Sequence, residues 1–311
     1  MTEPTVHILL ASHNGQAYLV QQLESIAIQT WLGWSLLVSD DGSTDHTKDI
    51  AARFASKVAQ PVRLIHGPCK GVAHNFFQLI NSVHAGHAND VYAFCDQDDV
   101  WLPNKLERAI THYLQQNLPP EQPYLYCGRT QVVDEKLHST GFSPTPHRPL
   151  GFGNALLQNI ASGNTMVFNG ALLSILRKID PVHCVMHDWS AYQVATACDG
   201  LVYYDSKPCL LYRQHGANVI GNKTGLRRRL KRLGGILKGD YRNWANQTEA
   251  AMDDIRACLS PSAVQQLHQF SLMRDLSNPV ARAKTALKSG LWTQAPFGKT
   301  VLLLIIFFGL I

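Results

Sequence analysis

Apolar and polar positions alternate in a regular way over the first 116 residues of the chain. Four short apolar runs have no helical period, as is typical of buried strands, and they cover residues 6–10, 35–39, 62–66 and 91–95. Segments with apolar residues at helical spacing follow them, at about residues 17–29, 47–56, 72–84 and 103–116. Strands joined to helices by short loops predict right-handed βαβ crossovers, and therefore an α/β fold with a mainly parallel sheet flanked by helices.

Proline residues interrupt this pattern at positions 119, 120 and 123, and the pattern beyond them is less regular. It predicts one or two strands over residues 124–133, a loop over 138–153, a strand at the end of 161–168, helices over 170–178 and 190–198, and strands over 201–212. Strands and helices therefore continue to about residue 220.

Residues 221–311 differ in character from the rest of the chain. Leu226, Leu230, Leu233 and Leu237 recur at helical spacing among basic residues, which predicts a basic amphipathic helix. Such a helix suits an anionic membrane surface or another anionic ligand, and equally a surface helix packed on the core by its leucines. It has no interleaved aromatic residues, so nucleic acid is not an expected partner.

The sequence closes with an uninterrupted apolar run over residues 301–311. A membrane-spanning helix needs about 20 residues, so this apolar tail is expected not to cross a bilayer. It could lie in a bilayer interface, pack in a hydrophobic groove, or begin a longer apolar segment.

The net charge of +5 hides two parts of opposite charge. Residues 1–220 hold 14 Lys and Arg against 18 Asp and Glu, a net −4, whereas residues 221–311 hold 14 against 5, a net +9. The basic part points to an anionic partner. The seven cysteines include no C-x-x-C pair, which argues for a reducing compartment and against a disulfide framework or a zinc ribbon. The N-terminus lacks the basic and apolar regions of a signal peptide, so none is expected.

Three carboxylates directly follow the fourth predicted strand, in the sequence CDQDDVWLPNKL. Like charges this close repel unless a cation lies among them, and carboxylate oxygens suit Mg²⁺ or Mn²⁺. Asp96 and Asp98, at the strand end, are therefore candidate ligands of such an ion. Asp99 fits the alternative that these acids only solvate a loop and favour the N-terminus of the next helix through its dipole.

Polar residues also follow the first two strands, and all three loops are expected at one edge of the sheet. Asn14 follows the first strand, Asp40 and Asp41 follow the second, and Asp96 follows the fourth. A nucleotide across this edge could meet the first two loops with its base and ribose and the third with its phosphates. No G-x-G-x-x-G or P-loop motif is present, so a metal would have to neutralise the phosphates. The alternative for Asp40 and Asp41 is a turn that caps the next helix.

Two residues of the later segments have two interpretations each. Asp188 precedes a helical segment, so it is either an N-terminal cap or, beside His187 and Trp189, a partly desolvated general base. His215 follows the last predicted strand, so it is either a hydrogen-bonded structural residue or a further metal ligand.

Together these segments resemble a family 2 glycosyltransferase of the GT-A fold, and within that family the bacterial rhamnosyltransferase-type enzymes. The matching segments are LLASHNGQAYLVQQLESIAIQT, VSDDGSTD, CDQDDVWLPNKL, ASGNTMVF, and HDW followed by YRQHGANVIG. The resemblance covers about residues 5–220. It implies a Rossmann-like GT-A domain over residues 1–220, with a nucleotide-sugar half to about residue 115 and an acceptor half over 116–220. Residues 221–311 would then be a basic helical region with an apolar tail.

The resemblance also implies roles for individual residues. Contacts to the nucleotide sugar are implied for Ser12, Asn14, Asp40, Asp41, Gly71, Asn75, Asp96 and Gln97. Ligation of Mg²⁺ or Mn²⁺ is implied for Asp96, Asp98 and His215, and Asp188 matches the position of the catalytic base.

Such a set of roles implies inverting transfer. A base acts on the acceptor hydroxyl, in line with a leaving nucleoside diphosphate whose charge the metal stabilises. The resemblance implies dTDP-L-rhamnose as the donor and a saccharide or lipid-linked saccharide of bacterial surface polysaccharide, such as O-antigen, as the acceptor. It places the enzyme in the cytoplasm, peripheral at the inner face of the plasma membrane.

Two departures from the family pattern are visible. YRQHG stands where processive members carry Q-x-x-R-W, so transfer of one or a few sugars is expected. Ala11-Ser12-His13 stands where many members have Pro-Thr-Tyr, which bears on the contacts to the base. Two other classes of protein stay open as alternatives: a metal-dependent nucleotidyltransferase or phosphohydrolase, and a non-catalytic sugar-nucleotide-binding module.

Overall fold

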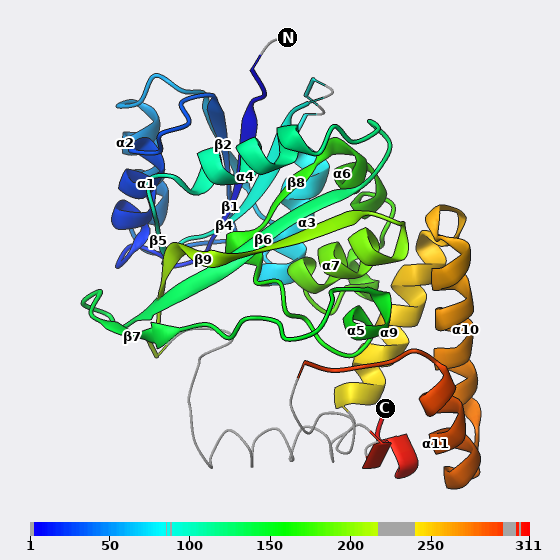
Figure 1. Cartoon of the computed structure of the whole chain (residues 1–311). Coiled ribbons are helices and arrows are strands. Elements are labelled where there is room, and N and C mark those ends of the chain that lie inside the picture. The colour runs from blue at the N-terminus through cyan, green and yellow to red at the C-terminus, as the bar shows by residue number, and fades with distance from the viewer. Residues whose placement is uncertain (1–2, 85, 88, 217–239, 295–302, 305) are drawn as a thin grey trace.

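A computed structural model of the chain describes residues 3–84, 86–87, 89–216, 240–294, 303–304 and 306–311. The basic amphipathic helix expected around residues 226–237 lies outside them. Figure 1 shows one central sheet with helices on its two faces, and the helices after residue 240 at one side of it.

The first four strands form the parallel part of the sheet, in the spatial order β3-β2-β1-β4. They are β1 (Val6–Ser12), β2 (Trp34–Asp40), β3 (Val62–His66) and β4 (Val91–Asp96), and the helices among them are α1 (Leu19–Ala27), α2 (Thr47–Ala55), α3 (Val72–Ser82) and α4 (Lys105–Gln115). Parallel pairing places Ser12 beside Asp40, and β4 ends next to β1, so three strand ends meet at one edge. The βαβ pattern is confirmed, although α4 begins at Lys105 rather than at Pro103.

Antiparallel pairing continues the same sheet into the second half of the chain. The further strands are β5 (Val100–Trp101), β6 (Tyr124–Val133), β7 (Ser139–Phe142), β8 (Val167–Asn169) and β9 (Leu201–Arg213). Strand β8 lies between β4 and β6 and is antiparallel to both, whereas β6 and β9 are parallel. Strand β5 pairs with β9, and β7 pairs with β6. The sheet is therefore mixed, with the short antiparallel strand β8 between two groups of parallel strands.

Some expectations for this half were wrong. Residues 138–153 are not a loop throughout, because they contain β7 and the start of the short helix α5 (Phe152–Ala155). Residues 201–212 belong to one long strand rather than several. The two-residue strand β5 was missed, since a run that short has no period to detect. The remaining elements are the 3₁₀ turns η1 (Gly163–Thr165) and η2 (Pro181–His183) and the helices α6 (Gly170–Leu176) and α7 (His187–Ala197).

Both faces of the central strands are buried, which explains why these strands are continuous apolar runs. Along β1, Ile8 and Leu10 point into a core shared with α1 and α4. Leu9 points into a second core shared with α3 and α7. Successive side chains of a strand alternate between faces, so one apolar run serves two cores.

After residue 239 the described chain forms three helices and a 3₁₀ turn: α9 (Asp240–Asp254), η3 (Arg256–Cys258), α10 (Pro261–Asp275) and α11 (Pro279–Lys288). The segment after α11 returns to α5, where Asn154 Nδ2 donates to the Trp292 carbonyl at 3.2 Å. The C-terminal helices pack on the sheet domain at η2, α7 and α5.

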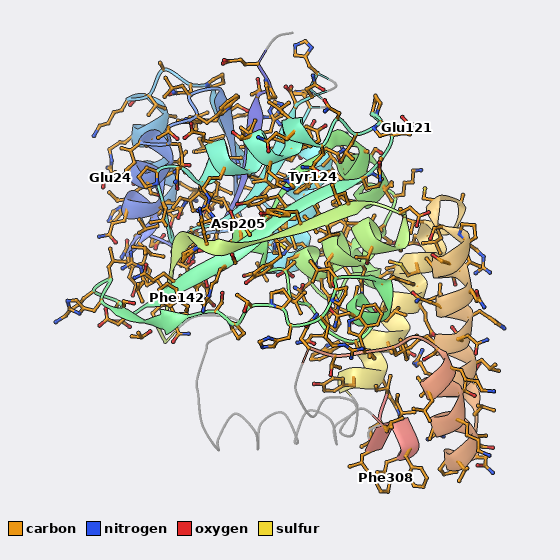
Figure 2. The ribbon with its side chains drawn as sticks, viewed as in Figure 1. Glu24, Glu121, Tyr124, Phe142, Asp205 and Phe308 are labelled. Atoms are coloured by element: carbon orange, nitrogen blue, oxygen red, sulfur yellow. The ribbon has the colours of Figure 1, made fainter. Side chains whose placement is uncertain are left out.

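Part of the apolar tail can be placed. Ile306 is buried in the core shared with α3 and α7, whereas Phe308 is exposed (Figure 2). Arg242 donates to the Gly309 carbonyl, and Arg282 donates to the carbonyls of residues 306 and 307. Among the described residues, no helix is both long enough and apolar enough to cross a membrane.

Candidate functional site

A cavity of about 870 Å³ opens where β1 and β4 end, beside the first turn of α7. Its wall combines the loops after β1, β2 and β4 with the start of α3, the turn at Ser162 and Gly163, the start of α7 and the end of β9. The predicted site residues on this wall are Ser12, Asn14, Asp41, Gly71, Asn75, Asp96, Gln97, Asp98, Asp188 and His215. Of the predicted site residues, Asp40 alone lies behind the wall. The cavity therefore lies at the sheet edge that the strand order predicts.

The loop after β1 is tied to the loop after β2. Asn14 adopts a positive φ of 47°, and its Oδ1 accepts from the Thr44 N–H at 2.9 Å. The Asn14 N–H donates to Ser43 Oγ at 2.8 Å. Ser12 Oγ donates to Asp40 Oδ1 at 3.2 Å. These contacts fix the backbone of both loops against each other on one side of the cavity.

Asp40 and Asp41 have different surroundings. Asp40 is turned inward, where its carboxylate accepts from the Ser43 N–H at 2.9 Å and from Ser43 Oγ at 2.5 Å. Asp41 is on the cavity wall and accepts from the N–H groups of Cys69 and Gly71 at 2.6 and 2.8 Å. The turn interpretation thus describes Asp40, and Asp41 fits a ligand contact.

Gly71 and Asn75 form the side of the cavity next to α3. Gly71 precedes α3 with φ of 87°, a conformation that suits glycine, and it presents its N–H to Asp41. Asn75 Nδ2 donates to the Ser39 carbonyl at 2.9 Å. Its Oδ1 is buried and has no hydrogen-bond partner in the described part of the chain. A buried acceptor without a partner beside a cavity is open to a ligand N–H or O–H.

The acidic loop holds its three carboxylates in three different ways. Asp96 ends β4 and faces the cavity. Burial, followed by repulsion from Asp98 and Asp188, raises the pKa of Asp96 to about 7. Asp98 Oδ2 pairs with His215 Nε2 at 2.7 Å. Asp99 does not solvate a loop, because it is fully buried and accepts from Asn164 Nδ2 at 2.5 Å.

Gln97, between these acids, joins the acidic loop to the loop after β1. Its Oε1 accepts from the His13 N–H at 2.9 Å, and its Nε2 donates to the His13 carbonyl at 3.0 Å. A Cβ at Gly15 would lie 2.2 Å from Gln97 Oε1, so a larger residue there would displace the Gln97 side chain. Gln97 reaches the cavity wall as a bridge between loops.

The acids of this loop fit a hard divalent cation in part. Asp96 and Asp98 share one cavity, and their mutual repulsion is relieved when a cation lies between them. Among the described residues, no group of three or more His, Cys, Asp and Glu side chains is arranged to hold a metal ion. The protein therefore offers two carboxylates, and a phosphorylated ligand would supply further oxygens.

Asp188 lies in the first turn of α7, but the residue before that helix is Met186 and the Asp188 side chain does not cap it. Its Oδ2 accepts from the Gly163 N–H at 3.1 Å, and its Oδ1 accepts from the Trp189 N–H at 2.7 Å. The side chain is 8% exposed and borders the cavity. Burial raises the pKa of Asp188 to about 6. A carboxylate that is ionised at neutral pH and yet unusually basic suits a general base.

His187, next to this carboxylate, was not among the predicted site residues. Its ring stacks on Phe76 at 3.6 Å between centroids and meets Phe94 edge-on at 4.8 Å. Both ring nitrogens are buried without a partner among the described residues. Burial lowers the pKa of His187 to about 3, so the imidazole is neutral. The pattern HDW gave no sign of this aromatic packing, because Phe76 is far away in the sequence.

Lys105 and Asn164 were missed for the same reason. Lys105 is fully buried, and its Nζ donates to the Asn164 carbonyl at 2.6 Å while lying 3.2 Å from the Trp101 ring centroid. Burial lowers the pKa of Lys105 to about 8. Both residues lie behind the cavity wall, next to the acidic loop.

The arrangement brings a basic carboxylate and a pair of repelling carboxylates to one cavity. The paired acids can hold a cation and a phosphorylated ligand, and Asp188 can take a proton from a second ligand. The cavity volume of about 870 Å³ is within the range of small-molecule sites. The site therefore suits transfer of a group from a phosphorylated donor to a hydroxyl.

Comparison with known sequences gives an independent line of evidence. The family model described as "Glycosyl transferase family 2" matches residues 7–172. The dTDP-rhamnosyl transferase RfbG of Shigella flexneri is 28% identical over 257 residues, which are 79% of this chain and 85% of that protein. The UDP-Glc:alpha-D-GlcNAc-diphosphoundecaprenol beta-1,3-glucosyltransferase WfgD of Escherichia coli is 30% identical over 118 residues, 38% of this chain and 44% of that protein.

Solved structures support the same fold. Residues 1–349 of S. aureus TarS, in complex with UDP-GlcNAc, superpose with a TM-score of 0.52 at 13% sequence identity. The match covers 92% of this chain and 89% of that one. At this level of identity the likeness concerns the fold alone.

Proposed function

The chain belongs to glycosyl transferase family 2, whose model matches more than half of its residues, and we propose that it is an inverting, metal-dependent transferase acting on a surface polysaccharide. It is a glycosyltransferase with the GT-A fold. The observation that carries the proposal is the meeting of Asp188 with Asp96 and Asp98 at one cavity.

The proposed donor is dTDP-L-rhamnose. The support is the similarity to the dTDP-rhamnosyl transferase RfbG, which extends over 79% of this chain. The walls next to Asp41, Gly71 and Asn75 offer polar groups for a base and ribose, and the end of β4 offers the metal site for a diphosphate.

The proposed acceptor is a saccharide or lipid-linked saccharide of a bacterial surface polysaccharide such as O-antigen. The name of the relative WfgD describes a diphosphoundecaprenol acceptor. We place the enzyme in the cytoplasm, at the anionic inner face of the plasma membrane, where such an acceptor lies. The net charge of +9 over residues 221–311 fits an anionic membrane surface, and the exposed Phe308 offers it an apolar contact.

In the proposed mechanism, Asp188 takes the proton of the acceptor hydroxyl. The acceptor oxygen attacks the anomeric carbon on the face opposite the diphosphate, so a new C–O bond forms as the bond to the diphosphate breaks and the configuration inverts. Asp188 is ionised at neutral pH because its pKa, raised by burial, is about 6. The N–H groups of Gly163 and Trp189 hold its two oxygens in place.

Asp96 and Asp98 would hold the cation, and His215, the further ligand expected from the sequence, would act instead by orienting Asp98 through the 2.7 Å contact. A bound Mg²⁺ or Mn²⁺ would supply charge neutralisation for the departing diphosphate. No second carboxylic acid is needed to protonate the leaving oxygen, unlike in glycoside hydrolysis.

Thermal stabilisation by dTDP, UDP, GDP and their sugars, with and without Mn²⁺, tests the donor site. A metal-dependent shift with one nucleotide is expected in the wild type, and its loss in Asp98→Ala. Asp253→Ala is the matched control, because Asp253 is an exposed acid paired only with Arg256 in the described structure. No shift with any nucleotide would refute the donor assignment.

An assay of sugar transfer separates the enzyme from the alternatives. Asp188→Asn is expected to keep the nucleotide-induced shift and to lose transfer by about 100- to 10,000-fold, the usual contribution of a general base. Nucleotide turnover without an acceptor and indifferent to Asp188→Asn would favour a phosphohydrolase or nucleotidyltransferase. Nucleotide binding without turnover in the wild type would favour a binding module.

A further inference from the structure

A buried polar cluster lies directly behind the cavity, between the acidic loop and the turn η1. It consists of Asp99, Lys105 and Asn164, none of which is more than 1% exposed. None of the three lies on the cavity wall, so none is placed to touch a ligand. The cluster is therefore outside the donor and acceptor sites described above.

Asn164 connects the two ionisable side chains of this cluster. Its Nδ2 donates to Asp99 Oδ2 at 2.5 Å, and its backbone carbonyl accepts from Lys105 Nζ at 2.6 Å. Its remaining side-chain atom, Oδ1, accepts from Ser162 Oγ at 2.8 Å. Asp99 and Lys105 form no direct ion pair within 4 Å in the described structure, so the asparagine stands between them.

The same asparagine follows Gly163, which contacts the proposed base. The Gly163 N–H donates to Asp188 Oδ2 at 3.1 Å. The two residues are also tightly packed, because a Cβ at Gly163 would lie 3.0 Å from Asp188 Cβ. A shift of the backbone at Asn164 would therefore move the group that holds the Asp188 carboxylate.

The value of this cluster is geometric. Asp99 on the acidic loop and Lys105 on α4 hold Asn164 from two sides through hydrogen bonds. A residue held in this way restricts the backbone of the adjoining Gly163. The contact chain runs from Asp99 through Asn164 and Gly163 to Asp188.

We propose that Asn164 is a positioning residue that fixes the Asp188 carboxylate relative to the acidic loop through Asp99 and Lys105. The proposal rests on the proposed function of Asp188 as the base. It predicts that the distance between the base and the donor is set by this buried cluster rather than by contacts inside the cavity.

A double-mutant cycle tests this proposal. Asn164→Ala is expected to lower kcat for sugar transfer by about 10- to 100-fold, the effect of a reacting group displaced by about 1 Å. The Kd of the nucleotide, measured by titration, is expected to stay within about twofold, because the donor wall is not touched. In the Asp188→Asn background, Asn164→Ala is expected to change the residual rate by less than about twofold, since the group it positions is already gone.

Asn169→Ala is the matched control. Asn169 is a buried asparagine at the far end of β8, where its Oδ1 accepts from the N–H groups of Tyr124 and Leu172. Its loss is expected to lower the melting temperature, and any change in kcat is expected to be the same with and without Asp188. If Asn164→Ala does not fold, Asn164→Ser is the second variant. Both substitutions keep the backbone carbonyl for Lys105 and remove the amide that reaches Asp99, but serine retains a polar side chain in the buried cluster.

Equal effects of Asn164→Ala in both backgrounds would overturn the proposal, as would a wild-type kcat in either Asn164 variant. A loss of nucleotide affinity that accounts for the whole rate change would also overturn it. Wild-type transfer by Asp188→Asn alone would instead refute the proposed role of Asp188. The two failures are thus distinguishable in one set of proteins.

Discussion

The pH dependence of folding stability is predicted to depend on His187. In the folded protein its imidazole is enclosed by Phe76 and Phe94 without a hydrogen-bond partner in the described residues, and burial lowers its pKa from 6.5 to about 3. The unfolded chain takes up a proton near pH 6.5, whereas the folded chain does not. Stability from this residue is therefore fully present above pH 6.5 and is lost as the pH falls towards 3.

The magnitude follows from the pKa difference. Each pH unit below the unfolded pKa costs about 1.4 kcal/mol until the folded pKa is reached. At about pH 4.5 the expected loss from His187 is therefore about 3 kcal/mol relative to neutral pH. Burial raises the pKa of Asp96 and of Asp188, and both act in the opposite direction, because their folded forms bind protons more readily.

Urea unfolding of the wild type and His187→Leu at about pH 7.5 and about pH 4.5 isolates this contribution. Leucine also branches at Cγ and does not titrate. The variant is expected to be less stable at neutral pH, where it loses the ring stack, and to lose about 3 kcal/mol less than the wild type on acidification. An identical pH dependence in the two proteins would refute the reasoning, because His187 would then be protonated in the folded state or hydrated.

Three further predictions concern the surroundings of Asp188. Burial raises the pKa of Asp188 to about 6, and only its ionised form can act as a base. The kcat for transfer should therefore fall about tenfold for each pH unit below that value. A kcat that is constant down to about pH 4 would contradict this prediction. Gly163→Ala should lower the rate of sugar transfer without abolishing nucleotide binding, because the new Cβ would lie 2.7 Å from His187 Nε2 and 3.0 Å from Asp188 Cβ. A wild-type transfer rate would mean that the turn moves freely. Phe76→Ala should lower the free energy of unfolding by about 3–5 kcal/mol in urea titrations, because the fully buried ring leaves a cavity in the core, and a loss below about 1 kcal/mol would show that the core collapses around it.

The first half of the fold was predictable from the sequence because its signals are local. Apolar runs of five residues, each followed by a helical period, specify the strands β1 to β4, and parallel pairing then brings their ends together. The position of Asp96 at the end of β4 and of Asn14 after β1 follows from that order alone. The short strands β5 and β7 carried no such signal and were missed.

The interior of the site was less predictable because its contacts are distant in sequence. Asn164 is 59 residues from Lys105 and 65 from Asp99, and no spacing rule joins them. The inward turn of Asp40 depends on Ser43, a residue that looks like any other polar turn residue until its hydrogen bonds are seen. The orientation of such side chains is fixed by tertiary packing, which a one-dimensional pattern does not record.

The place of β8 in the sheet has a consequence for recombination between relatives. This strand follows residue 116 in the chain, yet it pairs on one side with β4, which precedes that residue, and on the other with β6. A chimera joined near residue 116 would therefore have to form a sheet between strands of two parents. Exchanges of acceptor specificity should succeed more often when β4 and β8 are taken from the same parent, with the crossover points placed in the loops that surround the cavity.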